Sequence, residues 1–250
     1  MVYSVLVLSD SHLLGSRDRE LFGVNPYASL QKLSGHIREN HPPFDLVVVS
    51  GDLTDEGHSS AYNEIHNLIK DLGARTVWMM GNHDLIGHIP DELVRNYLFD
   101  DLSIQPWQII FLDTTIAGKD EGSLRFEEQR RLIRFLDKSR NSHVLIFLHH
   151  QPVDVGSAFI DEIGLKNKQE FWNILNKYQH VRGILFGHVH QEFDLEIHGT
   201  RVMSTPSTWI QFKPMAREFE PDDPTSACRI IHLHMDGSID TKIDRIDARF

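Results

Sequence analysis

Seven side chains that can bind a divalent metal ion are the part of this sequence with the clearest chemical potential. Each lies at or just beyond the end of a short apolar run: Asp10, His12, Asp52, Asn82, His149, His188 and His190. Carboxylate, amide and imidazole ligands without a thiolate suit first-row ions such as Mn, Fe or Zn. Seven ligands exceed what one such ion takes, but they suit two ions that share a carboxylate. Two ions about 3.5–4 Å apart form a known clamp for phosphoryl chemistry, so these residue types indicate a two-metal centre of that kind.

Taken singly, most of these motifs have ordinary explanations. Asp10-x-His12 fits a turn in which the aspartate bonds its own backbone, and Gly81-Asn82-His83-Asp84 fits an asparagine turn. Gly51-Asp52 fits a plain strand exit, and His149 fits a hydrogen-bonded core histidine. Gly187-His188-Val189-His190 is a stronger signal, because alternate residues of an extended segment face the same way. The occurrence of all the motifs together, in this order, favours the metal centre.

The apolar runs before these residues predict buried strands, which must position the ligands. The runs are at residues 5–8, 46–49, 76–80, 144–148 and 183–186. Helices are predicted at residues 26–39, from 59 or 60 to 72, 91–98, 127–136 and 167–178. A further strand is predicted at 107–112, and antiparallel strands are predicted at 193–197, 201–203, 229–235 and 239–246. Strands that alternate with helices predict an α/β fold. In such sheets ligands gather beyond the carboxyl ends of the strands, so we expect the seven side chains to converge there.

Three of the predicted helix ends carry capping signals. Asn25 before Pro26 predicts an N-cap for the first helix. Ser59 or Ser60 is predicted to cap the second helix, with Gly73 closing it. Asn167 and Glu170 form a predicted capping pair for the helix at 167–178.

Composition narrows the class of protein. The chain of 250 residues has 25 Lys plus Arg against 36 Asp plus Glu, and the resulting charge of −11 argues against nucleic acid or an anionic membrane as a partner. This net charge is compatible with a small anionic substrate that binds at a site made positive by metal ions. The lone cysteine, Cys228, is typical of a reducing compartment, and the N-terminal apolar run is cut short by Asp10, unlike a signal peptide or membrane span. We expect one domain over residues 1–250, located in the cytoplasm.

The motif series resembles the calcineurin-like metallophosphoesterase superfamily, over residues 10–190. Further segments are similar to the class III bacterial 3′,5′-cyclic-AMP phosphodiesterases of that superfamily: Gly23-Val24-Asn25, Trp107-Gln108-Ile109, Thr205-Pro206-Ser207-Thr208, Gln211-Phe212-Lys213-Pro214 and Arg249-Phe250. The resemblance implies a four-layer α-β-β-α sandwich. It also implies hydrolysis of cyclic AMP, a small-molecule substrate, to 5′-AMP by attack of a metal-bridging hydroxide on phosphorus. The oligomeric state is left open, with a homodimer as one option.

The same resemblance assigns roles to the candidate residues. Asp10, His12 and His190 would hold one ion, Asn82, His149 and His188 the other, and Asp52 would bridge them, with iron or manganese favoured and zinc as the alternative. His149 is preferred to its neighbour His150 because it directly follows the apolar run. His83 is the expected catalytic residue beside Asp52, a proton donor to the leaving group, with Asp84 either orienting it or solvated. The substrate phosphate would contact His12, Asn82, His83 and His190.

Other functions fit parts of the same pattern. The site could act on another phosphodiester, such as a glycerophosphodiester or a nucleotide pyrophosphate. A non-catalytic interaction scaffold of the same fold is disfavoured, because all seven candidate ligands and His83 are present. Trp209 and Phe212 either line a base pocket or belong to the core, whereas Trp107, Phe171 and Trp172 have the spacing of packing residues.

Overall fold

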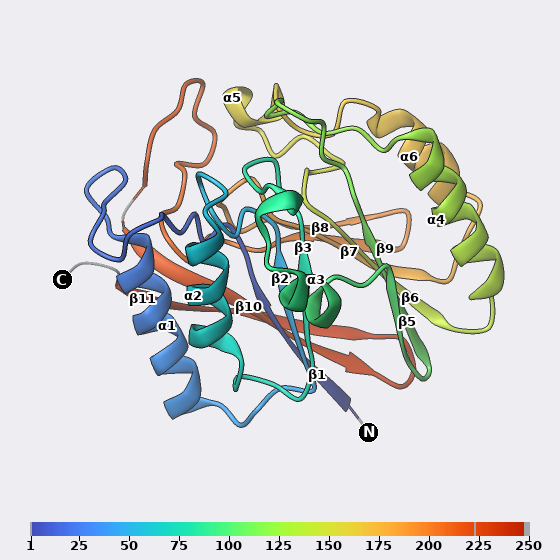
Figure 1. The fold of residues 1–250 in the computed structure, drawn as a ribbon. Helices are drawn as coiled ribbons and strands as arrows, with labels where there is room; N and C mark the ends of the chain where they lie inside the picture. The colour runs from blue at the N-terminus through green and yellow to red at the C-terminus, as the bar shows by residue number, and fades with distance from the viewer. Residues whose placement is uncertain (1, 223, 248–250) are drawn as a thin grey trace.

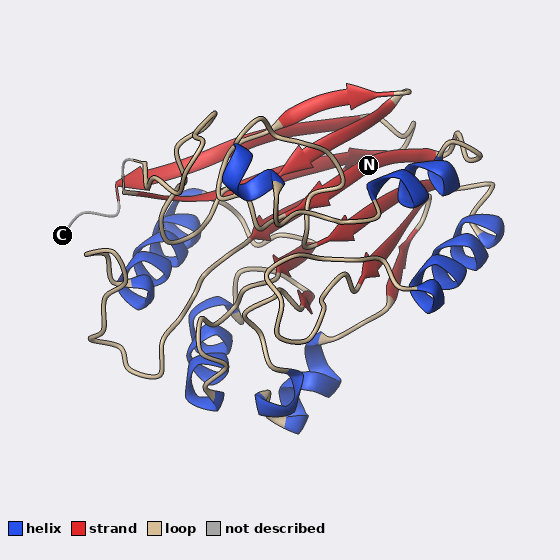
Figure 2. Ribbon diagram, turned by 90° about the horizontal axis from the view of Figure 1, so that it is seen from above, coloured by secondary structure: helices blue, strands red, loops and turns tan. Residues whose placement is uncertain are grey.

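The chain forms two β-sheets packed face to face between layers of helices (Figure 1). The computed structural model describes residues 2–222 and 224–247. Figure 2 shows the helices on the two outer sides of the paired sheets. The predicted four-layer α-β-β-α architecture is therefore confirmed.

The first sheet holds three of the strands that were predicted to carry ligands. Its order is β11 (Ile239–Asp247), β10 (Thr225–His234), β1 (Val2–Leu8), β2 (Leu46–Ser50) and β3 (Thr76–Met79). β1, β2 and β3 are parallel, so their carboxyl ends lie at the same edge. β10 pairs antiparallel with both β1 and β11.

The second sheet holds the other two strands predicted to carry ligands. Its order is β4 (Asp101–Ile104), β5 (Trp107–Leu112), β6 (His143–Leu148), β7 (Val181–Phe186), β9 (Thr200–Ser204) and β8 (Asp194–Ile197). β5, β6, β7 and β9 run parallel, while β4 and β8 are antiparallel edge strands. The expectation that every strand after residue 190 is antiparallel is thus wrong for β9, which pairs parallel with β7.

Helices cover the outer face of each sheet. The first sheet is covered by α1 (Pro26–Asn40) and α2 (Ser59–Ile69), with α3 (Asp91–Tyr97) against β3. The second is covered by α4 (Phe126–Lys138) and α6 (Lys168–Leu175). The loops also contain the short helices η1 (Ile86–His88) and α5 (Ala158–Asp161). Within the described residues no helix combines the length and apolarity that crossing a membrane requires.

Three separate apolar cores follow from the alternation of side chains along the strands. In β1, Leu6 and Leu8 pack toward the helices, whereas Val5 and Val7 pack against the second sheet. In β6, Ile146 likewise faces its helices. Each fully buried aliphatic side chain contributes roughly 1.5–3 kcal/mol, so both sheets are held rigidly and present their strand ends in fixed positions.

The capping signals were only partly right. Asn25 caps α1, since its Oδ1 accepts a hydrogen bond from the backbone N–H of Ala28 at 3.0 Å. Ser59 does not cap α2; it is the first helical residue, and its hydroxyl donates to the carbonyl of His88 instead. The helix ends at Ile69 rather than at 72, and Gly73 forms an isolated bridge with Phe44.

The other predicted capping pair also has a different role. Asn167 takes the N-cap position of α6, but its side chain makes no capping hydrogen bond. Its Oδ1 accepts from the backbone N–H of Leu124 at 2.9 Å, and the helix ends at Leu175 rather than at 178. Asn167 therefore ties α6 to the segment before α4. Arg249-Phe250, used in the resemblance, lies outside the described residues.

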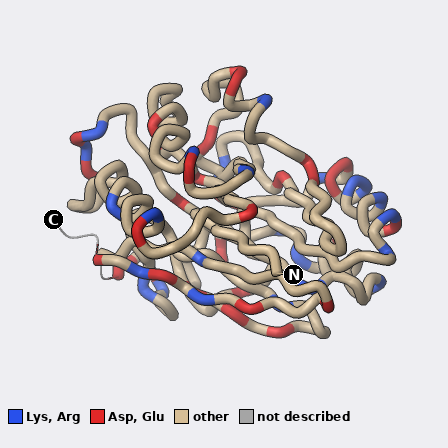
Figure 3. The backbone as a smooth tube through the Cα atoms, turned by 90° about the horizontal axis from the view of Figure 1, so that it is seen from below, with Lys and Arg blue, Asp and Glu red and all other residues tan. Residues whose placement is uncertain are grey.

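Acidic and basic positions are interspersed along the backbone that Figure 3 draws. Several of them are paired across the surface, such as Arg17 with Glu64 and Arg38 with Asp71.

Candidate metal centre

The seven predicted ligands are brought together where the two sheets present the carboxyl ends of their parallel strands. Asp10 and His12 follow β1, Asp52 follows β2 and Asn82 follows β3, while His149 follows β6 and His188 and His190 follow β7. The potential ligand atoms of Asp10, His12 and His190 lie within 4.8 Å of one another, as do those of Asp10, Asp52 and His149. The sequence thus located a real cluster, built from segments up to 180 residues apart.

Three of these histidines are oriented by the nitrogen that faces away from the cluster. Nδ1 of His149 donates to the carbonyl of Ser50 at 2.9 Å, and Nδ1 of His190 donates to the carbonyl of Ile210 at 2.9 Å. Nδ1 of His12 is bound to Oδ1 of Asp55 at 3.1 Å. For His12 and His190, a proton on Nδ1 leaves the lone pair on Nε2, which is how proteins orient imidazole for a metal ion.

The Nε2 atoms of His12, His149 and His190 point at one another or at oxygen atoms of the cluster. Nε2 of His12 and Nε2 of His190 face each other at 3.2 Å, and the buried Nε2 of His188 has no hydrogen-bond partner. Nε2 of His149 lies 3.1 Å from Oδ1 of Asn82 and 3.3 Å from Oδ2 of Asp52. Imidazole nitrogens and carboxylate oxygens that converge in this way fit a bound divalent cation.

The charges of two buried carboxylates, Asp10 and Asp52, also indicate a bound cation. Asp10 and Asp52 are 0% and 2% exposed, and in the described part of the chain neither forms an ion pair with a lysine or arginine. Burial raises the pKa of Asp52, but His149 and His12 outweigh it and hold the pKa well below its usual value. A buried carboxylate that stays ionised needs a positive partner.

The pKa shifts of two histidines, His149 and His188, indicate where a positive charge is favoured. Burial lowers the pKa of His149, but the charge and hydrogen bond of Asp52 overcome this and raise it to about 9. The position between Asp52 and Asn82 therefore favours a cation, either a proton or a metal ion. Burial and the neighbouring His150 and His149 lower the pKa of His188 far below its usual value, which keeps its imidazole neutral as a metal ligand requires.

Backbone strain is concentrated at the same residues. Eight non-glycine residues in the described chain have a positive φ between 45° and 66°, and five of them are predicted ligands: Asp10, His12, Asp52, His188 and His190. The left-handed region costs roughly 1–2 kcal/mol for a residue with a Cβ. Strain of this kind persists where the surrounding structure enforces it, and it clusters at functional sites.

Two glycines of the motifs are required by close packing in the centre. Gly51 has φ +96°, and a Cβ there would lie 2.3 Å from Nδ1 of His149. A Cβ on Gly81 would lie 2.1 Å from Oδ1 and 2.3 Å from the backbone N of Asp52. The sequence alone indicated only a tight exit at Gly51, whereas the structure shows that both glycines make room for ligand side chains.

Gly81→Ala is expected to displace Asp52, lowering metal affinity and reducing the free energy of unfolding by about 1–3 kcal/mol, as overpacking does. Denaturant unfolding and a metal titration followed by calorimetry measure the two effects. Gly35→Ala in α1 is the matched control, since a Cβ there meets nothing within 4 Å, and helix propensity should make it about 1 kcal/mol stabilising. A Gly81→Ala protein as stable and as metal-avid as the wild type would contradict this packing argument.

His83 lies beside the cluster, but its partner is not the predicted one. Its ring centroid is 4.8 Å from that of His12, its side chain is 37% exposed, and its Nδ1 lies 3.2 Å from Oδ1 of Asp55. Burial lowers the pKa of His83, but the hydrogen bond to Asp55 and the charge of Asp52 raise it to about 10. Asp55 contacts both His12 and His83, and sequence reasoning missed it because it follows Asp52 in a loop without a recognisable motif.

Asp84 was expected either to orient His83 or to be solvated, and both expectations are wrong. Its carboxylate is buried and accepts hydrogen bonds from the backbone N–H groups of Leu53, Thr54 and Gly81 and from the hydroxyl of Tyr62. Burial and the charge of Asp52 raise the pKa of Asp84 to about 7. Asp84 therefore ties the loop after β2 to the loop after β3.

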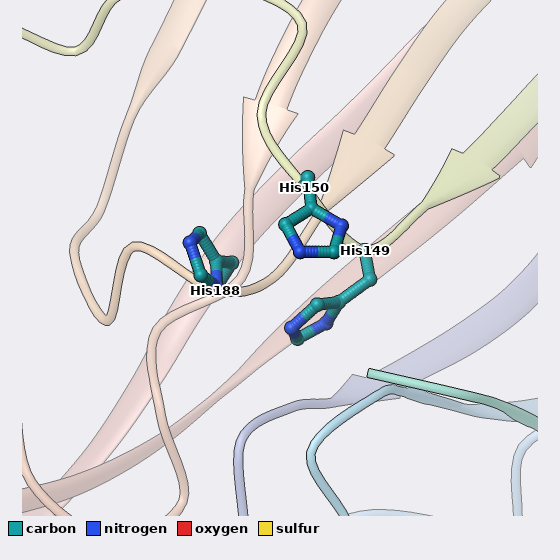
Figure 4. A group of neighbouring side chains, drawn as sticks. All are labelled: His149, His150 and His188. Atoms are coloured by element: carbon teal, nitrogen blue, oxygen red, sulfur yellow. The ribbon is translucent and has the colours of Figure 1, made fainter. Parts of the chain in front are cut away.

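His150 competes with His149 for the second ligand set. The rings of His149, His150 and His188 gather at the ends of β6 and β7 (Figure 4), and their potential ligand atoms lie within 4.8 Å of one another. However, Nδ1 of His150 is 2.8 Å from the hydroxyl of Thr114, and its Nε2 is 3.1 Å from the carbonyl of Asp120. Both nitrogens of His150 are thus engaged within the protein, which supports His149.

The segment 205–208 braces the first ligand loop. The hydroxyl of Ser207 donates to the carbonyl of Asp10 at 2.8 Å, and the backbone N–H of Thr208 donates to the carbonyl of Ser9 at 3.0 Å. Trp209 then packs against His12, with ring centroids 5.3 Å apart, and Phe212 stacks on His190 at 4.0 Å. Both aromatic residues contact predicted ligands and also belong to the packed interior, since Trp209 is buried and Phe212 packs against the core of the second sheet. Trp107 and Phe171 are fully buried packing residues, as expected, and Trp172 packs partly buried against the core of the second sheet.

Comparison with known proteins shows which family the chain belongs to. The chain is 35% identical to the 3′,5′-cyclic adenosine monophosphate phosphodiesterase CpdA of Escherichia coli K12, over 98% of this chain and 91% of that protein. It is 33% identical to the protein of the same name from Pseudomonas aeruginosa, over 96% and 89% of the two chains. A crystal structure of a dimetal phosphatase from Danio rerio shares the fold, with a TM-score of 0.67 at 15% identity over 99% of each chain. The family model described as calcineurin-like phosphoesterase matches residues 3–192, and the chain belongs to that family.

Proposed function

We propose that this protein is a metal-dependent phosphodiesterase that hydrolyses 3′,5′-cyclic AMP to 5′-AMP. The observation that carries the proposal is the convergence of histidine Nε2 atoms on two buried carboxylates, together with the buried Nε2 of His188 that has no hydrogen-bond partner. Such an arrangement would bind cations, and these cations would in turn bind a phosphate group. The choice of cyclic AMP among phosphodiesters is supported by the names of the relatives that match almost the whole chain.

Two ligand sets are proposed from the geometry. Asp10, His12 and His190 would hold one ion, and Asn82, His149 and His188 the other, with Asp52 shared between them. When bound, two divalent ions would neutralise charge on the phosphate and lower the pKa of the attacking water. The predicted phosphate contacts of His12, Asn82, His83 and His190 remain part of this proposal.

His83 is proposed to donate a proton to the departing ribose 3′-oxygen. Its contact with Asp55 fixes the ring through Nδ1, and its partly exposed side chain lies next to His12, where a substrate can reach it. Loss of the proton donor is expected to slow the reaction without removing the metals, because His83 belongs to neither ligand set. Asp55 is proposed as a positioning residue, since it acts through His12 and His83.

Removal and restoration of metal test the proposal. Protein purified without chelator should carry about two equivalents of divalent metal per chain, lose activity when stripped, and recover it on addition of Mn²⁺ or Fe²⁺. A panel of cyclic AMP, a glycerophosphodiester and a nucleotide pyrophosphate, assayed under one metal condition, should rank cyclic AMP first by kcat/KM. Full activity in the stripped protein, or a clear preference for another member of the panel, would overturn the proposal.

A further inference from the structure

A continuous band of aromatic rings leads away from the metal centre. Trp209 contacts His12, and Phe212 stacks on His190 with an interplanar angle of 9°. Beyond them, Phe22 lies 5.9 Å from Trp209, and Phe219 lies 5.2 Å from Phe212, centroid to centroid. The ring centroids of Phe22 and Phe219 are 5.0 Å apart, so the band closes on itself at its outer end.

The outer pair, Phe22 and Phe219, is exposed although both residues are large and apolar. Phe22 is 65% and Phe219 is 43% exposed, whereas Trp209 is only 3% exposed. Single exposed hydrophobic residues are common, but two phenylalanines from loops almost 200 residues apart, packed together and linked to a metal centre, form a shared surface. We call this pair the aromatic rim.

The backbone holds the aromatic rim in place. Phe22 lies in a tight turn closed by mutual backbone hydrogen bonds between Leu21 and Val24, and its φ is +51°. Apart from the predicted ligands, few non-glycine residues in the described chain adopt this conformation. The indole N–H of Trp209 donates to the carbonyl of Val24 at 3.3 Å, which ties the turn to the metal-side ring. Strain of this kind persists only where the surrounding structure holds the residue in place.

The second loop is anchored in a similar way. The backbone N–H of Lys213 donates to the carbonyl of Glu220 at 2.8 Å, and Phe212 pairs with Pro221. These contacts close a hairpin-like loop around Phe219. Phe219 is therefore presented by a constrained loop rather than by a free one.

We infer that the aromatic rim binds the purine base of a nucleotide whose phosphate lies on the metal centre. This inference rests on the proposed function and adds the group that recognises the base. Flat bases stack on aromatic side chains, and each such contact is worth about tenfold in affinity, with little dependence on which base stacks. The phenylalanine rings offer no hydrogen-bonding group, and the indole N–H of Trp209 is already used. The rim should therefore favour nucleotides over phosphate esters without a base, and discriminate weakly between purines.

The base contribution can be measured by binding alone. In the metal-loaded protein, the ratio of the Kd for ribose 5-phosphate to the Kd for 5′-AMP isolates what the base adds. Titration calorimetry should give a ratio of about 100 in the wild type and a ratio near one in the Phe22→Ala/Phe219→Ala double variant, with each single variant between. Metal content should not change, since neither residue is a ligand.

Phe126→Ala is the matched control, because Phe126 is also 65% exposed but lies at the start of α4. It should leave the ratio unchanged. KM for cyclic AMP should rise at least tenfold in the double variant, with kcat changed much less.

Several outcomes separate this inference from the proposed function. A wild-type ratio near one, or a ratio that the double variant leaves intact, would refute the aromatic rim even if cyclic AMP is hydrolysed. A large ratio that collapses in the double variant would uphold the rim even if another phosphodiester is the better substrate. An unaltered ratio accompanied by a change in sedimentation would instead identify the surface as a contact between copies of this chain.

Discussion

Asp52→Asn is expected to abolish hydrolysis and to remove most of the bound metal. Asparagine keeps the size of the side chain but removes its charge and leaves one metal-binding oxygen where the carboxylate has two. Asp52 lies 3.3 Å from His149 and 3.6 Å from His12, which the proposal places in different ligand sets, so both sets lose their shared ligand. Loss of several kcal/mol of transition-state stabilisation corresponds to a decrease of about 10³-fold or more in kcat/KM.

Thermal unfolding with and without metal provides a readout that does not depend on activity. Ligands that bind only the folded state raise Tm by mass action, so Mn²⁺ should stabilise the wild type and have little effect on Asp52→Asn. The stripped variant should be less stable than the stripped wild type, since it loses the buried carboxylate that pairs with His149. Elemental analysis of both proteins measures the lost metal directly.

Asp244→Asn is the matched control for this experiment. Asp244 is a partly buried carboxylate that pairs with His36 and His41, but it lies on β11, outside the centre. Its replacement should leave the metal content and kcat/KM unchanged. An Asp52→Asn protein that retains two tightly bound ions would exclude Asp52 as the shared ligand.

The clustering of the candidate ligands could be predicted from sequence because it follows from the direction of the strands rather than from the conformation of individual loops. Parallel strands end at one edge, so a polar residue after each apolar run must lie near the others. The apolar runs before Asp10, Asp52 and Asn82 are long and regular enough to be read as buried strands. The strand at residues 107–112 was predicted with its true bounds for the same reason.

What could not be predicted depends on loops, where no periodicity exists. Asp55 lies three residues beyond Asp52, and only the folded loop brings it to His12 and His83. Phe22 and Phe219 meet through two turns whose course no local pattern fixes. The short edge strand β4 was missed because four residues, Asp-Leu-Ser-Ile, give too little alternation to distinguish from a loop.

The left-handed backbone of the ligands is the other feature that sequence did not reveal. Aspartate and histidine tolerate a positive φ better than most residues, but nothing local requires it at Asp10 or His188. Hydrogen bonds from one loop to another accompany it: the backbone N–H of His188 donates to Asp10, and that of His83 donates to Asp52. The carboxylates of two candidate ligands thus bind the loops that carry His83 and His188.

His83→Ala is expected to lower kcat for cyclic AMP by about 10²–10⁴-fold while leaving both metal ions bound. The reason is that His83 lies beside His12 and contacts Asp55, but belongs to neither proposed ligand set. A proton donor matters only when the leaving oxygen needs a proton. The defect should therefore shrink strongly for bis(p-nitrophenyl) phosphate, whose leaving group is stable as an anion.

Asp55→Asn separates positioning from proton donation. It removes the charge that holds Nδ1 of His83 at 3.2 Å and Nδ1 of His12 at 3.1 Å, so it should cost about 10–100-fold in kcat, the range found for groups that orient ligands. Because His12 is a proposed ligand, Asp55→Asn should also weaken metal binding, which His83→Ala should not. His58→Ala, at an exposed histidine beside Glu56, is the control and should change neither kcat nor metal binding.

For His83→Ala, an equal decrease of kcat on cyclic AMP and on bis(p-nitrophenyl) phosphate would assign His83 to binding the phosphate rather than to protonating the leaving group.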